Sequence, residues 1–281
     1  MLRILITGAE GQLGQALQRV LQRDTVTGVD VQDGDITEPE TMPALLARQP
    51  VDVVIHCAAY TDVDGCSRDP QRAYLINGIG TQNVALACRE SGAAMVHVST
   101  NEVFSGRHPE GYDEWSSLEP INAYGRSKAM AEVHAQDILE RLYLVRTSWL
   151  FAPGGRNFIH AILRRARADG QVRVVADEVG SPTYVDDLAA SISELIRTGQ
   201  FGIYHLSNSG ACSRWSFAQE VLRLAGLPHV KNKPILARQY RRSSTPPPFA
   251  HLNNNVGRSL GIALRPWQEA LADYMVQHVN A

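Results

Sequence analysis

The feature that most constrains the fold is a regular alternation of short apolar segments with longer amphipathic ones, which begins at the first residues. Residues 2–7, 25–30, 51–58, 93–99 and 142–147 have the length and apolar character of buried strands. Residues 73–90 and 123–141 are predicted helices, and a further helix follows residue 12. Alternation of this kind is typical of βαβ units and predicts an α/β fold with a doubly wound parallel sheet.

Composition narrows the class of protein. The 281 residues are 44% apolar and 20% charged, with 27 basic against 29 acidic side chains, a net charge of -2 and no basic run longer than a pair. This balance argues against a nucleic-acid partner. The four cysteines lack CxxC spacing, and no apolar run approaches the roughly 20 residues of a membrane span. We therefore expect a cytoplasmic protein without a signal peptide or membrane anchor.

A glycine-rich turn joins the first predicted strand to the first helix. Gly8, Gly11 and Gly14, with Gln12 and Leu13 between the last two, form a GxxGxxG pattern. Glycines at such a turn permit close approach of the backbone to a pyrophosphate, which the helix N-terminus also attracts. The pattern predicts a Rossmann-like dinucleotide site, and a plain strand-turn-helix is the alternative.

Acidic residues follow the second predicted strand. Asp30 ends it, in the place from which a carboxylate contacts the ribose hydroxyls of an adenosine. Its charge would repel a 2'-phosphate, which favours NAD over NADP on charge alone. Asp35 and Ile36 are predicted to cover the adenine; the alternative is that Asp35 caps the helix near Pro39.

Three side chains form a candidate catalytic group. Tyr124 and Lys128 are four residues apart at the start of a predicted helix and therefore share one face. An ammonium group near a phenol is expected to lower the phenol pKa, so that Tyr124 can pass a proton to a carbonyl oxygen. Thr100 ends a strand where open α/β sheets bind ligands, and its hydroxyl could hydrogen-bond the same oxygen. The alternatives are a solvated Tyr–Lys pair and a turn or capping role for Thr100.

Longer motifs carry a resemblance to a known family. They are ITGAEGQLG, HCAAYTDVDGC, INGIGTQNVA, VSTNEVFSG, AYGRSK, VRTSWLFAPGGRNF, VADEVGSPTYVDDLA and GIYHLSNSG. Through them nearly the whole chain resembles the dTDP-4-dehydrorhamnose reductases of the extended short-chain dehydrogenase/reductase superfamily. The resemblance implies reduction of the C4 carbonyl of dTDP-4-dehydro-L-rhamnose to dTDP-L-rhamnose with NADPH or NADH, a step of dTDP-rhamnose biosynthesis for cell-wall polysaccharide.

The resemblance also implies residue roles. Thr100, Tyr124 and Lys128 would be the catalytic triad, with Tyr124 as proton donor and Lys128 also holding the nicotinamide ribose. Trp149 would lie near the sugar, and Asn77 matches a structural Asn of the superfamily or simply bonds the backbone. The residues implied to line the cofactor are Ala58, Ala59, Tyr60 and Thr61.

The chain departs from the family pattern at two places. Where the family commonly reads STDYVFDG, this chain has Asn101 and Glu102 after Thr100, closer to the STDE motif of nucleotide-sugar 4,6-dehydratases. Asn101 cannot serve as the acid of a dehydration. Ala16 replaces a Glu that some reductases place near a metal at a dimer contact, so no metal is expected, and the oligomeric state, monomer or homodimer, stays open.

The substrate side is expected from later segments. Residues 177–183, which include Pro182 and Thr183, resemble a family segment that faces the nucleotide of the sugar; an ordinary turn is the alternative. Arg241 and Arg242 could bind a diphosphate or could be solvated. Three histidines on predicted strands are interpreted as satisfied core or edge residues: His56, His97 and His205. Tyr60, Trp149 and Tyr184 are either stacking faces or core residues.

The domain organisation follows from a change in character after Phe151, where Pro153, Gly154 and Gly155 interrupt the alternation. We expect residues 1–150, rejoined by about 185–206, to form the dinucleotide-binding domain. Residues 151–184 and 207–281 would form a smaller C-terminal substrate-binding region, with a proline-rich loop at 238–248 and a helix at 267–279.

Three other functions remain open at this point: a 4-ketoreductase of other stereochemistry (6-deoxy-talose type), a nucleotide-sugar dehydratase or epimerase that regenerates its cofactor, and a non-catalytic cofactor-binding regulatory subunit.

Overall fold

A six-stranded parallel sheet forms the centre of the computed structural model, which describes residues 1–154 and 157–279. The strands follow the order β10-β5-β4-β3-β1-β2, and every neighbouring pair is parallel. Their bounds are β1 (Arg3–Thr7), β2 (Thr25–Val29), β3 (Val53–His56), β4 (Ala94–Thr100), β5 (Leu142–Thr147) and β10 (Gly202–His205). The α/β class and the doubly wound parallel sheet are confirmed.

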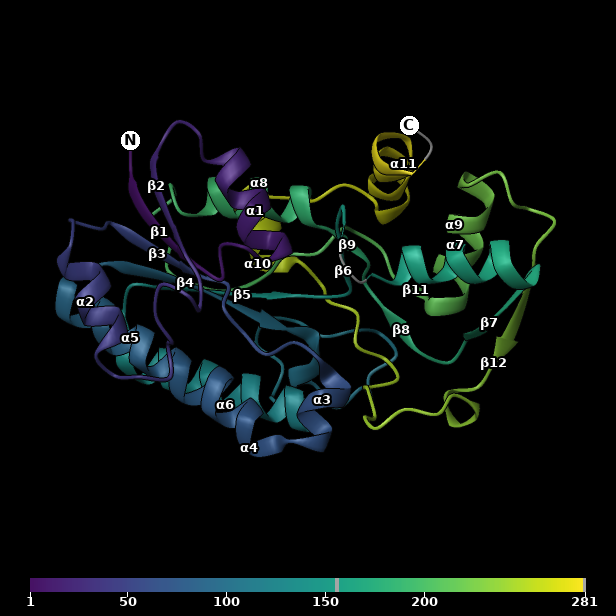
Figure 1. Ribbon diagram of the computed structural model, residues 1–281, viewed down its shortest axis with the longest axis horizontal. Coiled ribbons are helices and arrows are strands. Elements are labelled where there is room, and N and C mark those ends of the chain that lie inside the picture. Colours follow the sequence, from purple (N-terminus) through teal and green to yellow (C-terminus); the bar gives the residue numbers. More distant parts are fainter. Residues whose placement is uncertain (155–156, 280–281) are drawn as a thin grey trace.

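Helices cover both faces of the sheet (Figure 1). Alternate strand side chains enter two apolar clusters, and every residue of β5 is buried, as expected of a parallel strand covered on both faces. One face carries α1 (Gln12–Val20) and α8 (Val185–Leu195). The other carries α2 (Thr41–Ala47), α5 (Gly80–Ser91) and α6 (Ala123–Ile138).

The predicted helix at 73–90 is not one regular helix. After α3 (Val63–Arg68), a short α4 (Pro70–Ala73) leads into a π-helical turn, Tyr74–Ile79, before α5 begins. Asn77 lies in that turn, and its side chain bonds both backbone groups of Tyr60. The extra residue of a π turn therefore occurs where a side chain is needed for a neighbouring loop.

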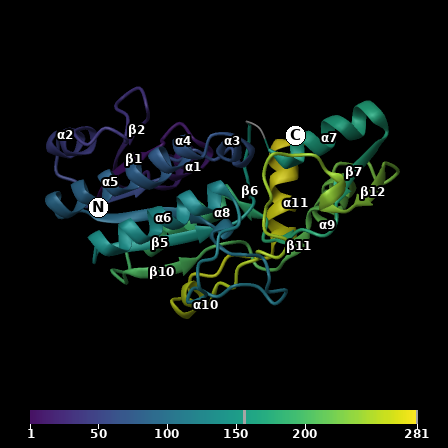
Figure 2. The same cartoon turned by 90° about the horizontal axis from the view of Figure 1, so that it is seen from below.

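A second group of elements lies beyond the carboxyl ends of the strands (Figures 1 and 2). Its helices are α7 (Phe158–Asp169), α9 (Arg214–Leu224) and α11 (Trp267–His278). Its strands pair in twos: β7 (Gln171–Val175) with β12 (Lys231–Ile235), β8 (Val179–Gly180) with β11 (Cys212–Ser213), and β6 (Leu150–Phe151) with β9 (Thr183–Tyr184). Gly155, part of the predicted break after Phe151, lies outside the described residues.

A strap, residues 240–248, runs from this second group back to the sheet. The backbone N–H and the hydroxyl of Ser244 both donate to Asp64 Oδ1 (2.8 and 2.6 Å), and Arg68 donates to Ser243 Oγ (3.3 Å). The predicted loop at 238–248 is wrong at its start, because a single 3-10 turn covers Ala237–Gln239. After the strap, α10 (Asn255–Ser259) packs against β10.

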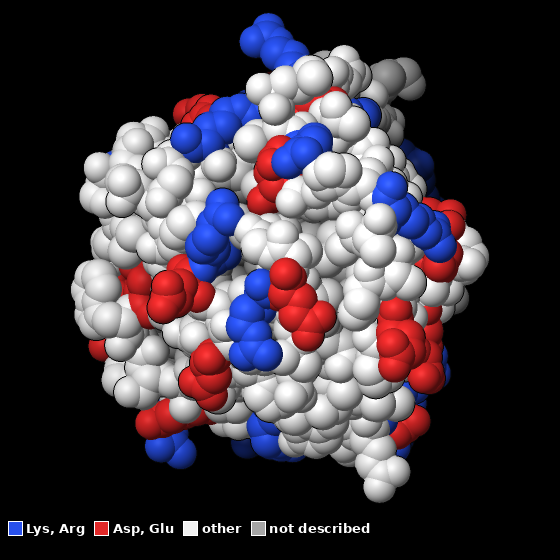
Figure 3. Space-filling model, turned by 90° about the vertical axis from the view of Figure 1, so that its left-hand side faces the viewer, with Lys and Arg blue, Asp and Glu red and all other residues white. Residues whose placement is uncertain are grey.

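The charged surface is mixed on the left-hand side of the molecule in Figure 1. Figure 3 shows Lys and Arg side chains interspersed with Asp and Glu there. Within residues 1–154 and 157–279, no helix is long and apolar enough to span a membrane.

Candidate active site

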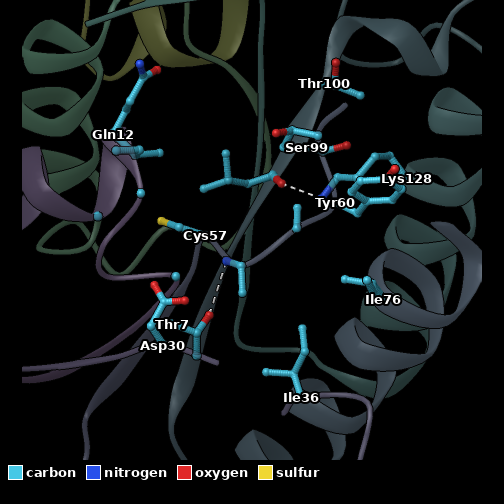
Figure 4. Close-up of a pocket in the computed structure, with 18 of the residues that line it drawn as sticks. Thr7, Gln12, Asp30, Ile36, Cys57, Tyr60, Ile76, Ser99, Thr100 and Lys128 are labelled. Atoms are coloured by element: carbon cyan, nitrogen blue, oxygen red, sulfur yellow. Dashed lines mark hydrogen bonds between the residues drawn. The ribbon is translucent and has the colours of Figure 1, made fainter. Parts of the chain in front are cut away.

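A cavity of about 900 Å³ opens at the carboxyl ends of β1, β3 and β4. Strand order reverses between β1 and β3, and this is where open α/β sheets bind ligands. In Figure 4, Gln12 and Asp30 lie on one side of the cavity and Thr100 and Lys128 on the other. The predicted site residues that line it are Gly8, Gly11, Gln12, Leu13, Gly14, Asp30, Asp35, Ile36, Ala58, Ala59, Tyr60, Thr61, Thr100, Asn101, Glu102, Tyr124, Lys128 and Trp149.

The glycine turn has the shape that a pyrophosphate needs. Gly8 has φ +67°, and a Cβ there would lie 2.7 Å from Ala58 N, so only glycine fits. Gly11 is the N-cap of α1 and makes no side-chain cap hydrogen bond. The first-turn N–H groups of α1, which begins at Gln12, are thereby left for a ligand anion. The turn thus fits a dinucleotide.

The far end of the cavity fits an adenosine. Asp30 Oδ2 accepts from Glu10 N and Oδ1 from Val31 N, both at 2.9 Å, which holds the carboxylate at the cavity wall. Asp35 Oδ1 accepts from the Thr37 backbone N–H and hydroxyl (both 2.9 Å). Helix α2 begins later, at Thr41, so the capping alternative for Asp35 is wrong.

Tyr124 lies in the first turn of α6, whose N-cap is Asn122; Asn122 Oδ1 accepts from Gly125 N (2.8 Å). The expectation that Lys128 lowers the phenol pKa is wrong for this structure. Burial raises the pKa of Tyr124, the Glu102 carboxylate raises it further, and a hydrogen bond with the Thr100 hydroxyl offsets only part of this. The phenol is therefore protonated at neutral pH, the form that can donate a proton.

Lys128 is one helical turn beyond Tyr124 and is 2% exposed. Its Nζ donates to the Val98 carbonyl oxygen (2.8 Å), as Figure 4 shows. Burial lowers the pKa of Lys128 to about 8, and the Glu132 carboxylate offsets part of that shift. Lys128 therefore titrates near physiological pH.

Behind Lys128 lies a buried ion pair that the sequence analysis missed. Arg146 on β5 contacts Glu132 through Nε (3.0 Å to Oε1) and Nη2 (2.8 Å to Oε2), and the two side chains are 2% and 0% exposed. Ser99 Oγ donates to Glu132 Oε1 (2.5 Å). The network ties α6 to β4 and β5 behind the catalytic side chains.

Asn77 holds the loop that follows β3. Its Oδ1 accepts from Tyr60 N (2.7 Å), and its Nδ2 donates to Tyr60 O (3.1 Å) and to Ser127 Oγ on α6 (2.9 Å). Asn77 thus bonds the backbone of Tyr60, and its bond to the Ser127 side chain joins this loop to α6.

Trp149 forms a strained wall at the other end of the cavity. Its φ of +43° makes it a non-glycine residue in the left-handed region. A Cβ on Gly180 would lie 2.5 Å from the Trp149 ring, so the ring packs directly on the glycine backbone. The Arg214 guanidinium lies 4.0 Å from the ring centroid.

Arg214 belongs to a charged cluster around Glu178, which is 1% exposed. Glu178 Oε2 contacts Arg214 Nε (3.2 Å), and its Oε1 is bonded by Arg242 of the strap. Arg242 thus faces inward while Arg241 is exposed. Sequence reasoning missed Arg214, which only the fold brings next to the 177–183 segment.

Pro182 and Thr183 are placed differently from the expectation. Both are buried outside the lining of the cavity. The Thr183 hydroxyl donates to Ser181 O (3.2 Å), within its own loop. In this structure the segment contacts the cavity indirectly, through Gly180 beneath Trp149.

Asn101 and Glu102 form a 3-10 turn, Asn101–Val103, that follows Thr100. Asn101 Nδ2 donates to Ala250 O (2.9 Å). Glu102 Oε2 accepts from Asn122 Nδ2 (2.5 Å), and burial raises the Glu102 pKa. Asn122 was not predicted, although an Asn just before a helix is a recognisable cap.

The histidines and the remaining aromatic residue lie in the core. His56 bonds Thr7 Oγ1 (2.8 Å) and Thr81 Oγ1 (3.0 Å), and His205 bonds Asn253 O (3.1 Å). The interpretation of His97 as satisfied is wrong, since neither ring nitrogen has a partner among the described residues. Tyr184 is 2% exposed and stacks on Phe151, so it is a core residue and not a stacking face for a ligand.

Comparison with known proteins gives the family. Residues 2–280 match the sequence model described as "RmlD substrate binding domain". The chain is 34% identical over 285 residues to dTDP-4-dehydrorhamnose reductase of Mycolicibacterium smegmatis, covering 99% of this chain and 86% of the relative. The chain belongs to the dTDP-4-dehydrorhamnose reductase family. The resemblance read from the motifs is thereby confirmed.

Two further comparisons also cover nearly the whole chain. Spore coat polysaccharide biosynthesis protein SpsK of Bacillus subtilis is 35% identical over 283 residues, covering 100% of this chain and 99% of the relative. The crystal structure of dTDP-4-dehydrorhamnose reductase from Bacillus anthracis in complex with NADP superposes with a TM-score of 0.94 at 37% identity, covering 98% and 99% of the two chains. The fold is that of the extended short-chain dehydrogenase/reductases.

Proposed function

We propose that the protein is an NAD(P)H-dependent oxidoreductase that reduces the C4 carbonyl of a dTDP-4-keto-6-deoxyhexose, converting dTDP-4-dehydro-L-rhamnose to dTDP-L-rhamnose. One observation carries the proposal. A cavity with a dinucleotide turn at one end holds Thr100, Tyr124 and Lys128 together at its centre. Full-length relatives named for this reaction support the substrate.

Each of the three side chains has a distinct task. Thr100 and Tyr124 hydrogen-bond to each other and can both donate to the carbonyl oxygen, which orients the ketone. The protonated Tyr124 gives its proton to that oxygen as negative charge develops there. Lys128, fixed on the Val98 carbonyl, contributes its charge beside the phenol and holds the nicotinamide ribose. A bound reduced nicotinamide supplies the hydride.

The dinucleotide and the sugar nucleotide occupy opposite ends of the cavity in this proposal. The glycine turn and Asp30 hold the dinucleotide, with Ala58, Ala59 and Thr61 along its path. Trp149 lines the cavity and contacts the sugar, and Arg214, which packs on the Trp149 ring, and Arg242, which shares Glu178 with it, reach the diphosphate. In this proposal residues 1–150 with about 185–206 hold the cofactor, residues 151–184 with 207–281 hold the substrate, and Trp149, at the end of the first group, also contacts the sugar. A cytoplasmic location is part of this proposal.

The alternatives have less support. Dehydration needs an acid beside the base, and Asn101 is an amide bonded to Ala250 O. A regulatory subunit does not need the bonded Thr100–Tyr124 pair. A talose-type 4-ketoreductase would use the same residues with the other face of the ketone turned toward the nicotinamide.

To test this, the purified protein is supplied with dTDP-4-keto-6-deoxy-L-hexose, which a dehydratase and an epimerase generate in situ. The absorbance of NADH and of NADPH is followed in parallel assays. Cofactor consumption with dTDP-rhamnose as product is the expected result. A 6-deoxy-talose product would keep the mechanism and change the stereochemistry. Cofactor binding without net consumption would refute the reductase and favour the dehydratase or the regulatory alternative.

A further inference from the structure

The proposed reaction gives no task to the buried carboxylate of Glu102, which lines the cavity. Reduction needs a proton donor, and Tyr124 provides it. Glu102 also lines the cavity and is only 9% exposed. A carboxylate held in so dry a place costs free energy, and such groups cluster where chemistry needs them.

The position of Glu102 is fixed relative to the carbonyl-binding pair. Its backbone N–H donates to Thr100 Oγ1 (3.2 Å). Its carbonyl oxygen packs on the first turn of α6, where a Cβ on Gly125 would lie 2.1 Å from it. Thr100, Glu102 and Tyr124 are therefore held as one unit by a strand end and a helix start.

The carboxylate of Glu102 has one oxygen engaged and one available. Oε2 accepts from Asn122 Nδ2 (2.5 Å), which orients the group. Within the described part of the chain, Oε1 has no hydrogen-bond partner, and it is not among the occluded polar atoms. An oriented carboxylate with a free oxygen in a cavity has the form of a general base.

We propose that Glu102 removes and returns a hydrogen on a carbon next to the C4 carbonyl, so that the protein exchanges that hydrogen with solvent. The proposal rests on the proposed function, because that function places the 4-keto sugar here. Hydrogens next to a carbonyl are the acidic ones of such a sugar. Polarisation of the oxygen by Thr100 and Tyr124 makes their removal easier.

The step balances without an oxidant. The C–H bond breaks and Glu102 takes the proton; the electron pair forms the C=C bond of an enol, and the carbonyl oxygen takes the Tyr124 proton. The protonated Glu102 exchanges its proton with solvent, and the reverse step then returns a solvent-derived proton to carbon and regenerates the ketone and the phenol. Burial raises the Glu102 pKa, which strengthens it as a base. Because Asn101 supplies no acid, exchange occurs without loss of water.

The experiment uses full-length protein saturated with NADP⁺, so that no reduction can occur. Each dTDP-4-keto-6-deoxyhexose that the protein reduces with NADPH is purified, placed in D₂O and followed by proton NMR at H3 and H5. We expect one of these signals to disappear at least about tenfold faster than without protein. Glu102→Gln should lower that rate about 100-fold or to the background, the loss typical of a removed general base.

Two further variants serve as controls for this experiment. Glu110→Gln removes an exposed carboxylate outside the cavity and should exchange like the wild type. Glu102→Asp keeps a carboxylate and should retain more exchange than Glu102→Gln, with NADP⁺ binding showing that each variant is folded. Reduction without exchange by the wild type, or undiminished exchange by Glu102→Gln, would overturn this inference alone. A protein that reduces none of the ketones refutes both proposals.

Discussion

The two ends of the cavity are built in different ways. At the dinucleotide end, backbone atoms of one short stretch make the surface: the Gly8 turn and the first N–H groups of α1. Behind Trp149, at the end that the proposed function assigns to the sugar, charged side chains from distant segments meet outside the cavity lining, with Arg214 and Arg242 on Glu178. The first end is a local structure that one motif encodes, whereas the second exists only once the whole chain has folded.

The largest effect is expected from a substitution that lies between the two ends of the cavity. Tyr124→Phe removes the proton donor and should lower kcat for ketone reduction about 10²- to 10⁴-fold. Binding of NADPH, followed by its fluorescence, should change little, because the phenol hydroxyl is not part of the glycine turn. Ketone reduction at the wild-type rate by this variant would show that the catalytic centre lies elsewhere.

The titration of Lys128 should make the free energy of unfolding depend on pH. Its pKa is about 8 in the folded protein against 10.5 for a free lysine, so the unfolded chain binds more protons between these values. The free energy of unfolding of the wild type should therefore rise by about 3 kcal/mol from pH 8 to 10.5 relative to Lys128→Met. Urea titrations across this window measure it, with Lys231→Met, an exposed change, as control. Parallel curves for wild type and Lys128→Met would contradict the burial argument.

Arg242 tests the sugar end alone. Arg242→Gln removes one of the two cations on Glu178 and should raise KM for the sugar nucleotide about tenfold, the loss of one charge-assisted contact. The Kd for NADPH should not change. Arg241→Gln is the matched control, since the neighbouring side chain is exposed. Equal effects of the two substitutions would remove Arg242 from the substrate site.

Asp30 tests the dinucleotide end and should give the smallest change. Asp30→Asn removes a negative charge where a 2'-phosphate would lie and should raise the preference for NADPH over NADH severalfold, through about 1 kcal/mol of relieved repulsion. Ratios of kcat/KM for the two cofactors measure it. Asp137→Asn, an exposed change on α6 outside the cavity lining, is the control. An unchanged ratio would mean that another residue sets the cofactor preference.

The sequence predicted most of the fold because its signals are local. Strand length, helix periodicity and the glycine turn are all properties of short stretches, and the parallel sheet follows from them. The π-helical turn at Tyr74–Ile79 was missed because a contact with Tyr60, distant in sequence, accompanies it. The fold also overturned the predicted effect of Lys128 on Tyr124, since spacing on a helix face does not reveal how dry the surroundings are.

At the site, the sequence does not predict residues whose positions depend on ion pairs between distant segments. Tyr124 and Lys128 could be found because they share one helix turn. Arg214 could not, because nothing near it in sequence indicates that Glu178 will lie 3.2 Å away. The inward orientation of Arg242, but not Arg241, likewise depends on the buried Glu178 carboxylate.

The strap sets the order in which the cavity can be completed during synthesis. Ser244 bonds Asp64 across 180 positions of sequence. The glycine turn and its strands emerge early and contain mainly near neighbours, so they can form while the ribosome is still at work. The sugar end must wait until residues 240–248 have left the exit tunnel. A nascent chain stopped before the strap would therefore present a dinucleotide turn facing an open, unfinished substrate side.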